Sequence, residues 1–309
     1  MKLAFLYAGQ GTQHPGMGRD LYERYPAFRA VWDGLEVDFD LKGLCFDGPS
    51  ELLDQTQYTQ PCMVAFAAGV TAVLAEAGVV PALAAGLSLG EYSALCAAGV
   101  FDARTAVELV AFRGKAMAQA VQGRLSAMSA VLMLDRDTLR RCCDEARRLG
   151  VVELANLNCP GQIVIGGDAE AVAEAGRLAL AAGARRVLPL KVSGPFHTSL
   201  MAPAGRALEE RFQSVPFGPM AFPVYFNCLG GPMGAGDTIP QLLVRQVQSG
   251  VRMEDTIRAM AAAGVDTIVE IGPGKALSGF VRKTAGTIKT YAVETAEEVE
   301  AVLAALKGA

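Results

Sequence analysis

Short apolar runs alternate along this chain with longer stretches of helical character. A short apolar run bounded by turn residues favours a buried strand, whereas apolar residues repeating every three to four positions favour a helix. Outside residues 125–190, the pattern predicts strands at 3–8, 82–85, 224–227 and 267–271. It predicts helices at 20–35, 51–77, 91–98, 103–122, 240–252 and 254–263, with two more after residue 200 and after the turn at 272–275. This alternation is typical of an α/β fold with a parallel sheet.

One predicted helix carries a polar interruption. The segment 57–61 (QYTQP) divides the stretch from 51 to 77. Pro61 suits the first turn of a helix, because its missing N–H needs no intrahelical partner there. From Gln60 to Ala77 the sequence is nearly all apolar, so we expect this helix to be buried against the sheet.

Residues 125–190 follow a different pattern. Strands are predicted at 127–134, 151–157, 162–165 and 185–190, and helices at 136–149 and 168–182, with Asp135 capping the first helix. The order βαββαβ is that of a ferredoxin-like unit. We therefore predict a large α/β subdomain formed by residues 1–124 and 191–309, and a small insert formed by residues 125–190.

The stretch from Pro81 to Gly99 has the strand–turn–helix pattern of a nucleophile elbow. A short apolar run leads into the pentapeptide 86–90 (GLSLG), and a helix-like segment follows. Glycines suit such a turn because a Cβ would block the close backbone approaches it requires. Ser88 then lies at a helix N-terminus, where the Leu89 N–H can point at a developing oxyanion. The alternative is a chance match in a chain with 34 glycines, which the flanking strand and helix disfavour.

Two glycine-rich turns resemble phosphate loops only superficially. Residues 9–13 (GQGTQ) follow the first strand, and residues 272–275 (GPGK) follow a later one, but neither has the Rossmann or the P-loop spacing. We expect the first turn to present the Gln10 side chain and backbone amides at the carboxyl end of a strand. The second is predicted to be a packing turn.

Composition excludes several classes of protein. With 309 residues, 51% hydrophobic and 19% charged, the chain can bury a large core. A formal net charge of −4 gives no overall attraction to nucleic acid or to an anionic membrane, so we predict neither as a partner. The first apolar run is too short for a secretory signal, and no apolar stretch of membrane-spanning length is free of charge and glycine.

The seven cysteines show neither a disulfide framework nor a metal-binding pattern. None lies in a C-x-x-C or Cys/His spacing, and most have apolar neighbours. We therefore expect reduced, buried thiols in a cytoplasmic protein without a metal site.

Two residues supply candidate chemistry beyond the elbow. His197, one of only two histidines, follows a Gly-Pro turn and is either a general base or a structural histidine. Arg113 interrupts the apolar face of the helix at 103–122. It either extends to water or points inward, and a buried guanidinium needs an anionic partner. No nearby Asp or Glu is evident as that partner, which leaves room for a ligand.

Seven motifs together resemble the malonyl-CoA:acyl carrier protein transacylases of fatty-acid synthesis, over nearly the whole chain. In order they are Gly9–Gln13, Tyr58–Pro61, Gly86–Leu95, Arg113–Met117, Asn156–Gln162, Gly194–His197 and Glu270–Gly274. The resemblance implies an α/β-hydrolase-like large subdomain that carries a small ferredoxin-like insert.

The resemblance also implies residue roles. Ser88 is the expected nucleophile and His197 its base, and the backbone amides of Gln10 and Leu89 are the expected oxyanion hole. Arg113 is expected to bind the malonyl carboxylate. The other implied residues are Gln60, Asn158 and Phe196 in the substrate site and Gln246, whose carbonyl orients the imidazole in place of an acidic residue.

Three positions depart from the family's pattern. Leu87 stands where His usually precedes the serine, and Ala8 replaces the usual Pro before Gly-Gln-Gly. Residues 250–253 (GVRM) replace the usual Pro-Val-x-Trp. None of these changes removes a reacting group, but Leu87 and Met253 can reshape the pocket that selects the acyl chain.

The implied reaction moves a malonyl group from malonyl-CoA to the phosphopantetheine thiol of acyl carrier protein through a malonyl-serine intermediate, without a cofactor of the enzyme's own. Because that partner is acidic, basic residues are candidate contacts, or else simple solvated charges: Arg185, Arg186, Lys191, Arg282 and Lys283. We expect a cytoplasmic monomer, whose carrier belongs to either fatty-acid or polyketide synthesis. A serine hydrolase or thioesterase would share Ser88 and His197 without needing Arg113. A silent interaction domain is disfavoured, because all the reacting groups are present.

Overall fold

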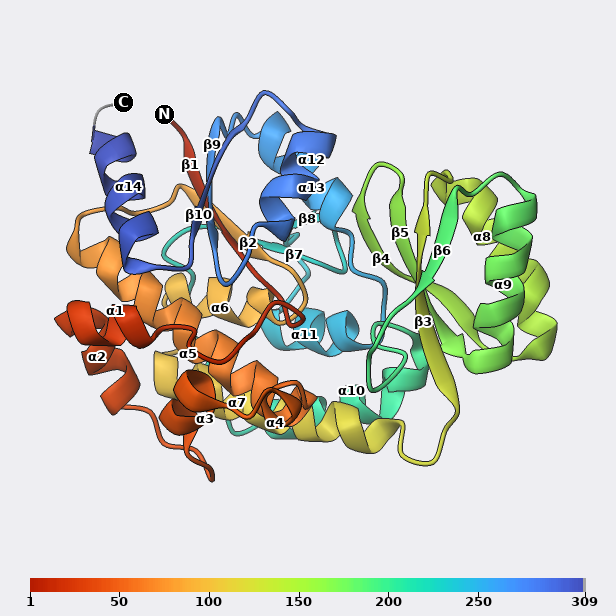
Figure 1. Cartoon of the computed structure of the whole chain (residues 1–309), viewed down its shortest axis with the longest axis horizontal. Coiled ribbons are helices and arrows are strands. Elements are labelled where there is room, and N and C mark those ends of the chain that lie inside the picture. The colour runs from red at the N-terminus through yellow and green to blue at the C-terminus, as the bar shows by residue number, and fades with distance from the viewer. Residues whose placement is uncertain (308–309) are drawn as a thin grey trace. The chain divides into compact units, whose positions relative to one another are not determined.

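In the computed structural model, which describes residues 1–307, the chain forms two compact units (Figure 1). The first comprises Met1–Lys115, Pro216–Phe226 and the segment from Ala259 onward. The second comprises Ala116–Val215 and Asn227–Arg258, and so contains the whole of the predicted insert at 125–190. Helices α7 (Ala103–Ala120) and α12 (Met253–Ala262) begin in one unit and end in the other.

The first unit is built on a parallel sheet, as the sequence predicts. Its strands are β1 (Leu3–Tyr7), β2 (Leu83–Gly86), β7 (Val224–Phe226), β9 (Thr267–Ile271) and β10 (Lys289–Val293). They lie in the order β10-β9-β1-β2-β7, and every pairing among them is parallel. Its helices are α1 (Arg19–Arg24), α2 (Pro26–Asp33), α3 (Leu41–Asp47), α4 (Ser50–Leu53), α5 (Thr56–Glu76), α6 (Gly90–Ala97), α13 (Ala276–Thr284) and α14 (Ala296–Lys307).

The register of the central strands brings three loops to one edge of this sheet. Tyr7, at the end of β1, lies opposite Gly86 of β2 on one side and Ile271 of β9 on the other. β1 and β9 are buried along their whole lengths. Burial on both faces explains the unbroken apolar sequence of β1, whereas β9 also contains the buried polar residues Thr267 and Glu270. The loops that follow β1, β2 and β9 therefore start side by side, where α/β sheets bind their ligands.

Helix α5 is the buried core helix that its apolar sequence predicts, but the place of Pro61 within it was predicted wrongly. The helix begins at Thr56, so Pro61 lies inside it and the polar segment 57–61 is helical. Among the described residues α5 alone is long and apolar enough to cross a membrane, and 72% of its most apolar window is buried inside the structure. It contacts α2, α6 and β9, as a core helix does.

Other boundaries also differ from the prediction. The helix expected at 20–35 is divided into α1 and α2 at Tyr25, which is extended because a residue before proline avoids the helical region. α3, β10 and α14 were not predicted. α3 is short, with Gly43 inside it, and β10 is only partly buried, so neither gives a strong apolar period.

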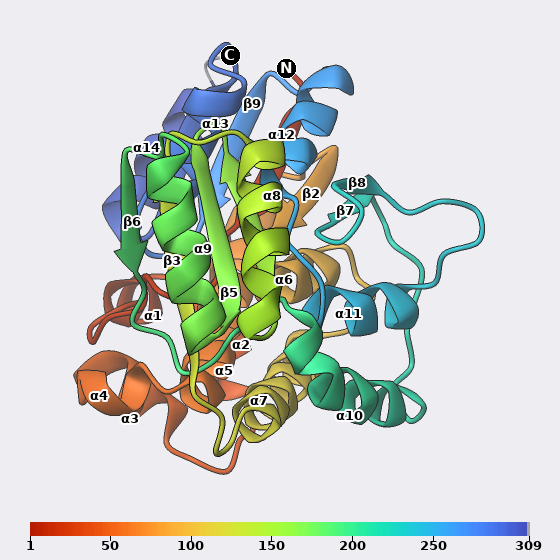
Figure 2. The same cartoon turned by 90° about the vertical axis from the view of Figure 1, so that its right-hand side faces the viewer.

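The second unit contains a four-stranded sheet with two helices on one face (Figures 1 and 2). The strands β3 (Ser126–Leu132), β4 (Val152–Cys159), β5 (Gln162–Asp168) and β6 (Arg186–Pro189) lie in the order β4-β5-β3-β6, with every pairing antiparallel. Helices α8 (Arg136–Ala146) and α9 (Ala169–Ala181) pack on it through an apolar core that includes Leu139 and Ile165. Asp135 caps α8 as predicted, accepting a hydrogen bond from the Thr138 N–H at 2.9 Å.

The rest of the second unit is formed by α10 (Ala202–Phe212), α11 (Ile239–Val247), the short strand β8 (Gly231–Pro232) and two 3-10 turns, Arg147–Leu149 and Ser199–Met201. α10 and α11 pack against each other. α11 ends at Val247, five residues before the predicted end at Arg252. The chain beyond it pairs with β4 instead, through an isolated bridge between Asn156 and Val251.

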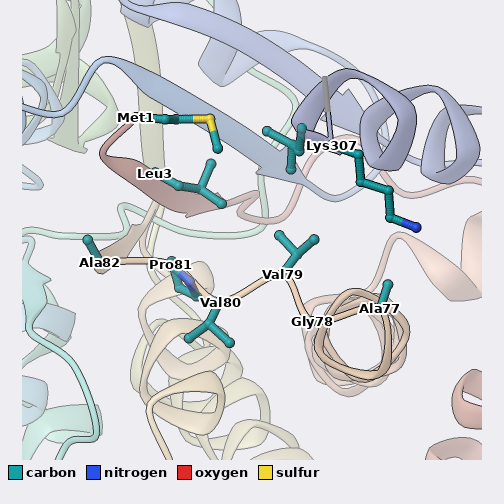
Figure 3. Close-up of a pocket in the computed structure, with 10 residues that line it drawn as sticks. Met1, Leu3, Ala77, Gly78, Val79, Val80, Pro81, Ala82 and Lys307 are labelled. Atoms are coloured by element: carbon teal, nitrogen blue, oxygen red, sulfur yellow. The ribbon is translucent and has the colours of Figure 1, made fainter. Parts of the chain in front are cut away.

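A shallow groove lies at the opposite, amino-terminal edge of the parallel sheet (Figure 3). It is lined by Met1, Leu3, residues 77–82, Leu306 and Lys307. These residues include no serine, cysteine, histidine or carboxylate side chain. The candidate chemistry therefore lies at the other edge.

Candidate active site

The predicted nucleophile elbow is present at the carboxyl end of β2. β2 ends at Gly86, Ser88 has a φ of 52°, and α6 begins at Gly90. A positive φ is uncommon for a residue with a side chain and is held by the surrounding turn. A Cβ on Gly86 would lie 2.0 Å from the Gly90 carbonyl carbon, and one on Gly90 would lie 2.2 Å from the Tyr7 oxygen. Both glycines are therefore required sterically, as predicted.

The hydrogen bonds of the elbow leave the Leu89 amide without an acceptor inside the turn. The Gly90 N–H donates to the Leu87 carbonyl at 2.9 Å, and the Glu91 N–H donates to the Ser88 carbonyl at 3.1 Å. The N–H of Leu89 has no acceptor within the turn, because a helix leaves its first amides without intrahelical partners. This placement suits an amide that stabilises negative charge beside Ser88.

Arg113 points inward and reaches the elbow, so the interpretation in which it extends to water is wrong. It is fully buried on α7. Its Nη1 donates to Gln60 Oε1 at 2.9 Å, and its Nη2 donates to Ser88 Oγ at 3.2 Å. The glycine at position 114 lets helix α7 lie close to helix α5, because a Cβ there would lie 2.8 Å from the Thr56 oxygen of α5. The structure thus places a guanidinium directly beside the candidate nucleophile.

No acidic neighbour of Arg113 was evident from the sequence, but the structure places Glu91 close enough to act on its charge. Burial lowers the pKa of Arg113, whereas Tyr92 and the negative charge of the buried Glu91 raise it, and the net shift is downward. The guanidinium carbon also lies 5.5 Å from the centre of the Tyr92 ring. Glu91 and Tyr92 follow the elbow directly, so the short helix α6 supplies both a counter-charge and an aromatic platform.

Gln60 connects Arg113 to the loop that follows β1. Its Oε1 accepts from Arg113, and its Nε2 donates to Gln10 Oε1 through a long contact of 3.4 Å. Gln60 is fully buried within α5. The structure therefore joins Gln10, Gln60, Arg113 and Ser88 into one polar chain inside the first unit.

The second unit holds the candidate base. His197 is buried, and its Nδ1 lies 2.9 Å from the carbonyl oxygen of Gln246, at the end of α11. A carbonyl only accepts hydrogen bonds, so this contact requires a proton on Nδ1 and leaves Nε2 of the neutral ring as the proton acceptor. The structure therefore brings together His197 and Gln246, the pair that the resemblance implies, and this contact fixes the tautomer that a general base requires.

The predicted substrate-site residues of the second unit, Phe196 and Asn158, are also buried. His197 itself has a φ of 61°, so both candidate reacting residues, Ser88 and His197, occupy the left-handed region. Phe196 is buried beside it. Asn158, at the end of β4, is buried with no hydrogen-bond partner for its Oδ1 among the described residues.

The remaining predicted residues divide between the units. Leu87 is half-buried. A Cβ on residue 9 would lie 2.6 Å from the Leu87 carbonyl oxygen, so the backbone of Leu87, and not its side chain, explains why residue 9 is a glycine. Met253 is fully buried at the start of α12. The proposed docking residues are all exposed, three in the second unit and two in the first: Arg185, Arg186, Lys191, Arg282 and Lys283.

Metal sites require a set of donor side chains placed around one ion. No group of three or more His, Cys, Asp or Glu side chains within residues 1–307 is placed to hold a metal ion. None of the seven cysteines, all of which lie in the described part of the chain, forms a disulfide, and six of them are buried. Burial raises the pKa of Cys96 to about 12, which keeps that thiol protonated and unreactive. The second glycine-rich turn is a packing turn, as predicted, because a Cβ on Gly272 would lie 2.4 Å from that of Ala8.

Comparison with known proteins first gives the class of protein. The family model for the acyl transferase domain matches residues 4–303 of this chain. The chain is 42% identical to the malonyl CoA-acyl carrier protein transacylase of Bacillus subtilis, over 99% of this chain and 98% of that protein. It is 39% identical to the protein of the same name from Escherichia coli, over 98% and 99% of the two chains.

Solved structures agree with these relatives. A structure from Streptococcus pneumoniae described as MCAT is 44% identical, covers 98% of this chain and 100% of its own, and has a TM-score of 0.93. A malonyl-transacylase solved with a type II polyketide synthase acyl-carrier protein is 37% identical, covers 99% and 100%, and has a TM-score of 0.95. The chain belongs to the malonyl-CoA:acyl carrier protein transacylase family.

Proposed function

We propose that this chain transfers the malonyl group of malonyl-CoA to the phosphopantetheine thiol of acyl carrier protein, through an ester on Ser88. The observation that carries this proposal is the contact between Arg113 and Ser88. It supports the proposal because a guanidinium matches the geometry of a carboxylate, and this one donates to the hydroxyl of the proposed nucleophile. A malonyl group has a carboxylate two carbon–carbon bonds from its thioester carbon. One guanidinium next to the serine can therefore hold the acid end while the other end reacts.

In the first half-reaction Ser88 Oγ attacks the thioester carbon and His197 Nε2 takes its proton. The tetrahedral oxyanion accepts hydrogen bonds from the amides of Leu89 and Gln10. When the carbon–sulfur bond breaks, the CoA sulfur leaves with the proton from the imidazolium. Ser88 then carries the malonyl ester, and His197 is neutral again.

In the second half-reaction the carrier thiol gives its proton to the same imidazole and attacks the ester. The proton returns to Ser88 Oγ as the ester bond breaks. No acidic side chain is needed beside the imidazole, because the Gln246 carbonyl already selects the tautomer. The reaction requires no cofactor of the enzyme's own, and its kinetics are ping-pong.

The proposal extends to the architecture and setting of the enzyme. The first unit is α/β-hydrolase-like, and the β4-β5-β3-β6 antiparallel order with two helices on one face supports a ferredoxin-like insert at residues 125–190. The proposed large subdomain, residues 1–124 and 191–309, also includes residues 116–124, 191–215 and 227–258, which belong to the second compact unit. Asn158 and Phe196 line the substrate site. The enzyme is a cytoplasmic monomer that binds neither nucleic acid nor a membrane.

The test is a mass measurement on intact enzyme mixed with malonyl-CoA in stoichiometric amounts. We expect one malonyl adduct, located on the peptide that contains Ser88, and its loss when acyl carrier protein is added. Ser88→Ala is the matched control and should give no adduct. Release of free malonate without a lasting adduct or carrier transfer would identify a hydrolase instead.

A further inference from the structure

The main chain around His197 is fixed by a carboxylate on β4. The Ser199 N–H donates to Glu153 Oε2 at 2.8 Å, and the Ser199 hydroxyl donates to Glu153 Oε1 at 2.8 Å. Both carboxylate oxygens of Glu153 therefore bind one residue, two positions after the imidazole. On the other side, the Thr198 hydroxyl donates to the Pro195 carbonyl at 2.6 Å and closes the turn over His197.

The same strand also holds the segment that follows the Gln246 carbonyl. The Leu157 N–H donates to the Val251 carbonyl at 2.8 Å, and the Val251 N–H donates to the Ala155 carbonyl at 2.9 Å. Gly250 allows this approach, because a Cβ there would lie 2.4 Å from the Leu154 oxygen. Residues 153–157 of β4 thus contact both the loop that carries the imidazole and the segment after the helix that orients it.

We propose that Glu153 is a positioning residue for the general base, acting through Ser199 on the backbone of His197. This inference rests on the proposed role of His197 as the base. A histidine with a φ of 61° needs its neighbours to hold it, since the left-handed region is unfavourable for residues with side chains. Glu153 supplies two hydrogen bonds to the residue at the start of the following 3-10 turn, where the N–H groups lack intrahelical partners. No carboxylate is proposed to bind the His197 ring itself. The Glu153 carboxylate instead binds the main chain two residues further on, at Ser199.

In this proposal Glu153 acts on Ser199 through its two hydrogen bonds and not through its negative charge. The variants Glu153→Gln and Glu153→Ala separate the effect of the hydrogen bonds from that of the charge. Glu153 lies in a groove with Arg136, Arg140, Arg147 and Arg252, so removing its charge alters that groove as well. In Glu153→Gln the amide oxygen can still accept from the Ser199 N–H, while the Ser199 hydroxyl can accept from the amide nitrogen. Glu153→Ala removes both contacts.

The kinetic test measures the single-turnover rate of Ser88 malonylation and the KM for malonyl-CoA. We expect Glu153→Ala to lower the acylation rate roughly 10- to 100-fold, because a misplaced catalytic group loses that much. Glu153→Gln should stay within about threefold of the wild type, and Ser199→Ala should fall between them, since it keeps the backbone contact. The KM should change little, because Arg113 and Gln60 are untouched. Asp135→Ala, which removes a carboxylate cap from α8 in the same unit, is the matched control and should leave the rate unchanged.

A second measurement reads the imidazole without any substrate. The chain has only two histidines, so enzyme labelled with ¹⁵N-histidine gives two imidazole spin systems, and His14→Gln assigns them. We expect Glu153→Ala to shift the His197 ring nitrogens toward a mixture of tautomers, with those of His14 unchanged. Glu153→Gln should restore the wild-type signals.

The outcomes separate this inference from the proposed function. Unchanged His197 signals and an unchanged acylation rate in folded Glu153→Ala would overturn the positioning role. So would an equal loss of rate in Glu153→Ala, Glu153→Gln and Asp135→Ala, since that pattern reports stability alone. If the wild type forms no ester on Ser88, the proposed function fails, and the ring signals still decide whether Glu153 sets the state of His197.

Discussion

Arg113 makes three contacts through one buried guanidinium. One edge donates to Gln60 and another to Ser88, and one face lies over the ring of Tyr92. Burial lowers its pKa because water no longer solvates the charge, which makes an additional anion in the pocket favourable. A substrate carboxylate would supply that anion. The residue is therefore suited to distinguish malonyl from acetyl groups.

We predict that Arg113→Ala lowers malonyl transfer far more than acetyl transfer. A charge-assisted hydrogen bond contributes about 1.5–3 kcal/mol, which corresponds to roughly one to two decades of selectivity. The measurement is the ratio of kcat/KM for malonyl-CoA to that for acetyl-CoA. Arg104→Ala, an exposed arginine on the same helix, is the control and should leave the ratio unchanged. Equal losses with both substrates would mean that the guanidinium does not recognise the carboxylate.

At the scale of elements, the loop after β1 is tied to the turn after β10. His14 Nε2 lies 2.5 Å from Glu294 Oε1, and Glu294 Oε2 accepts from the Gly274 N–H at 2.8 Å. His14 Nδ1 lies 3.0 Å from the Pro15 carbonyl oxygen. Both ring nitrogens face acceptors, so the contacts favour the imidazolium form. One carboxylate thus links the loop that carries Gln10 to the loop that follows β9.

This link should make stability depend on pH. The hydrogen bond to the Pro15 carbonyl, and next the one to Glu294, raise the pKa of His14 above its ordinary value of 6.5. A raised pKa in the folded state contributes stability below the unfolded value, and that contribution is lost as pH rises through the folded value. We therefore expect His14→Gln to lower Tm at about pH 5.5 and to have little effect at about pH 9.

The measurement is the difference in Tm between the wild type and His14→Gln across that pH range, because the pH dependence of all the other groups is common to both proteins and cancels. Arg24→Gln, which removes an exposed ion pair with Glu300 of α14, is the control, because its effect should not follow a histidine titration. A difference that stays constant with pH would show that His14 is not held in its charged form.

For the whole molecule, the chain leaves the first unit and returns to it twice. Residues 116–215 and 227–258 build the second unit, which contains His197 and Gln246, whereas Ser88 and Arg113 belong to the first. The formal net charge is −4, so an acidic carrier protein must meet a local basic surface. Arg282 and Lys283 are exposed in the last turn of α13 and are candidates for such a surface.

We predict that Arg282→Gln with Lys283→Gln raises the KM for acyl carrier protein severalfold, and more at low ionic strength, because screening weakens exposed charge pairs. Neutral glutamines are preferable to acidic residues, which would oppose the helix dipole at this end. Malonylation of Ser88 by malonyl-CoA should be unchanged. Lys289→Gln, an exposed charge on β10, is the control. The same effect in the control, or on both half-reactions, would exclude α13 as the docking surface.

The contrast between predicted and observed elements has a physical pattern. Strands β1 and β9 and the elbow at 86–90 were predicted well, because burial on both faces and tight turns leave local marks in the sequence. β10 and α3 were missed, since partial burial weakens the apolar period. Pro61 was placed at a helix start, but the helix begins five residues earlier.

The sequence by itself determined the α/β class, the order of the seven motifs, the elbow at Ser88 and the family. Each depends on residues close together in the chain, where steric and hydrophobic requirements are local. Only the tertiary structure decided that Arg113 turns inward to Ser88, that Glu91 and Tyr92 lie beside it, and that Glu153 holds the loop of His197. These contacts join residues far apart in the chain, and packing chooses among such partners in ways that no local pattern records.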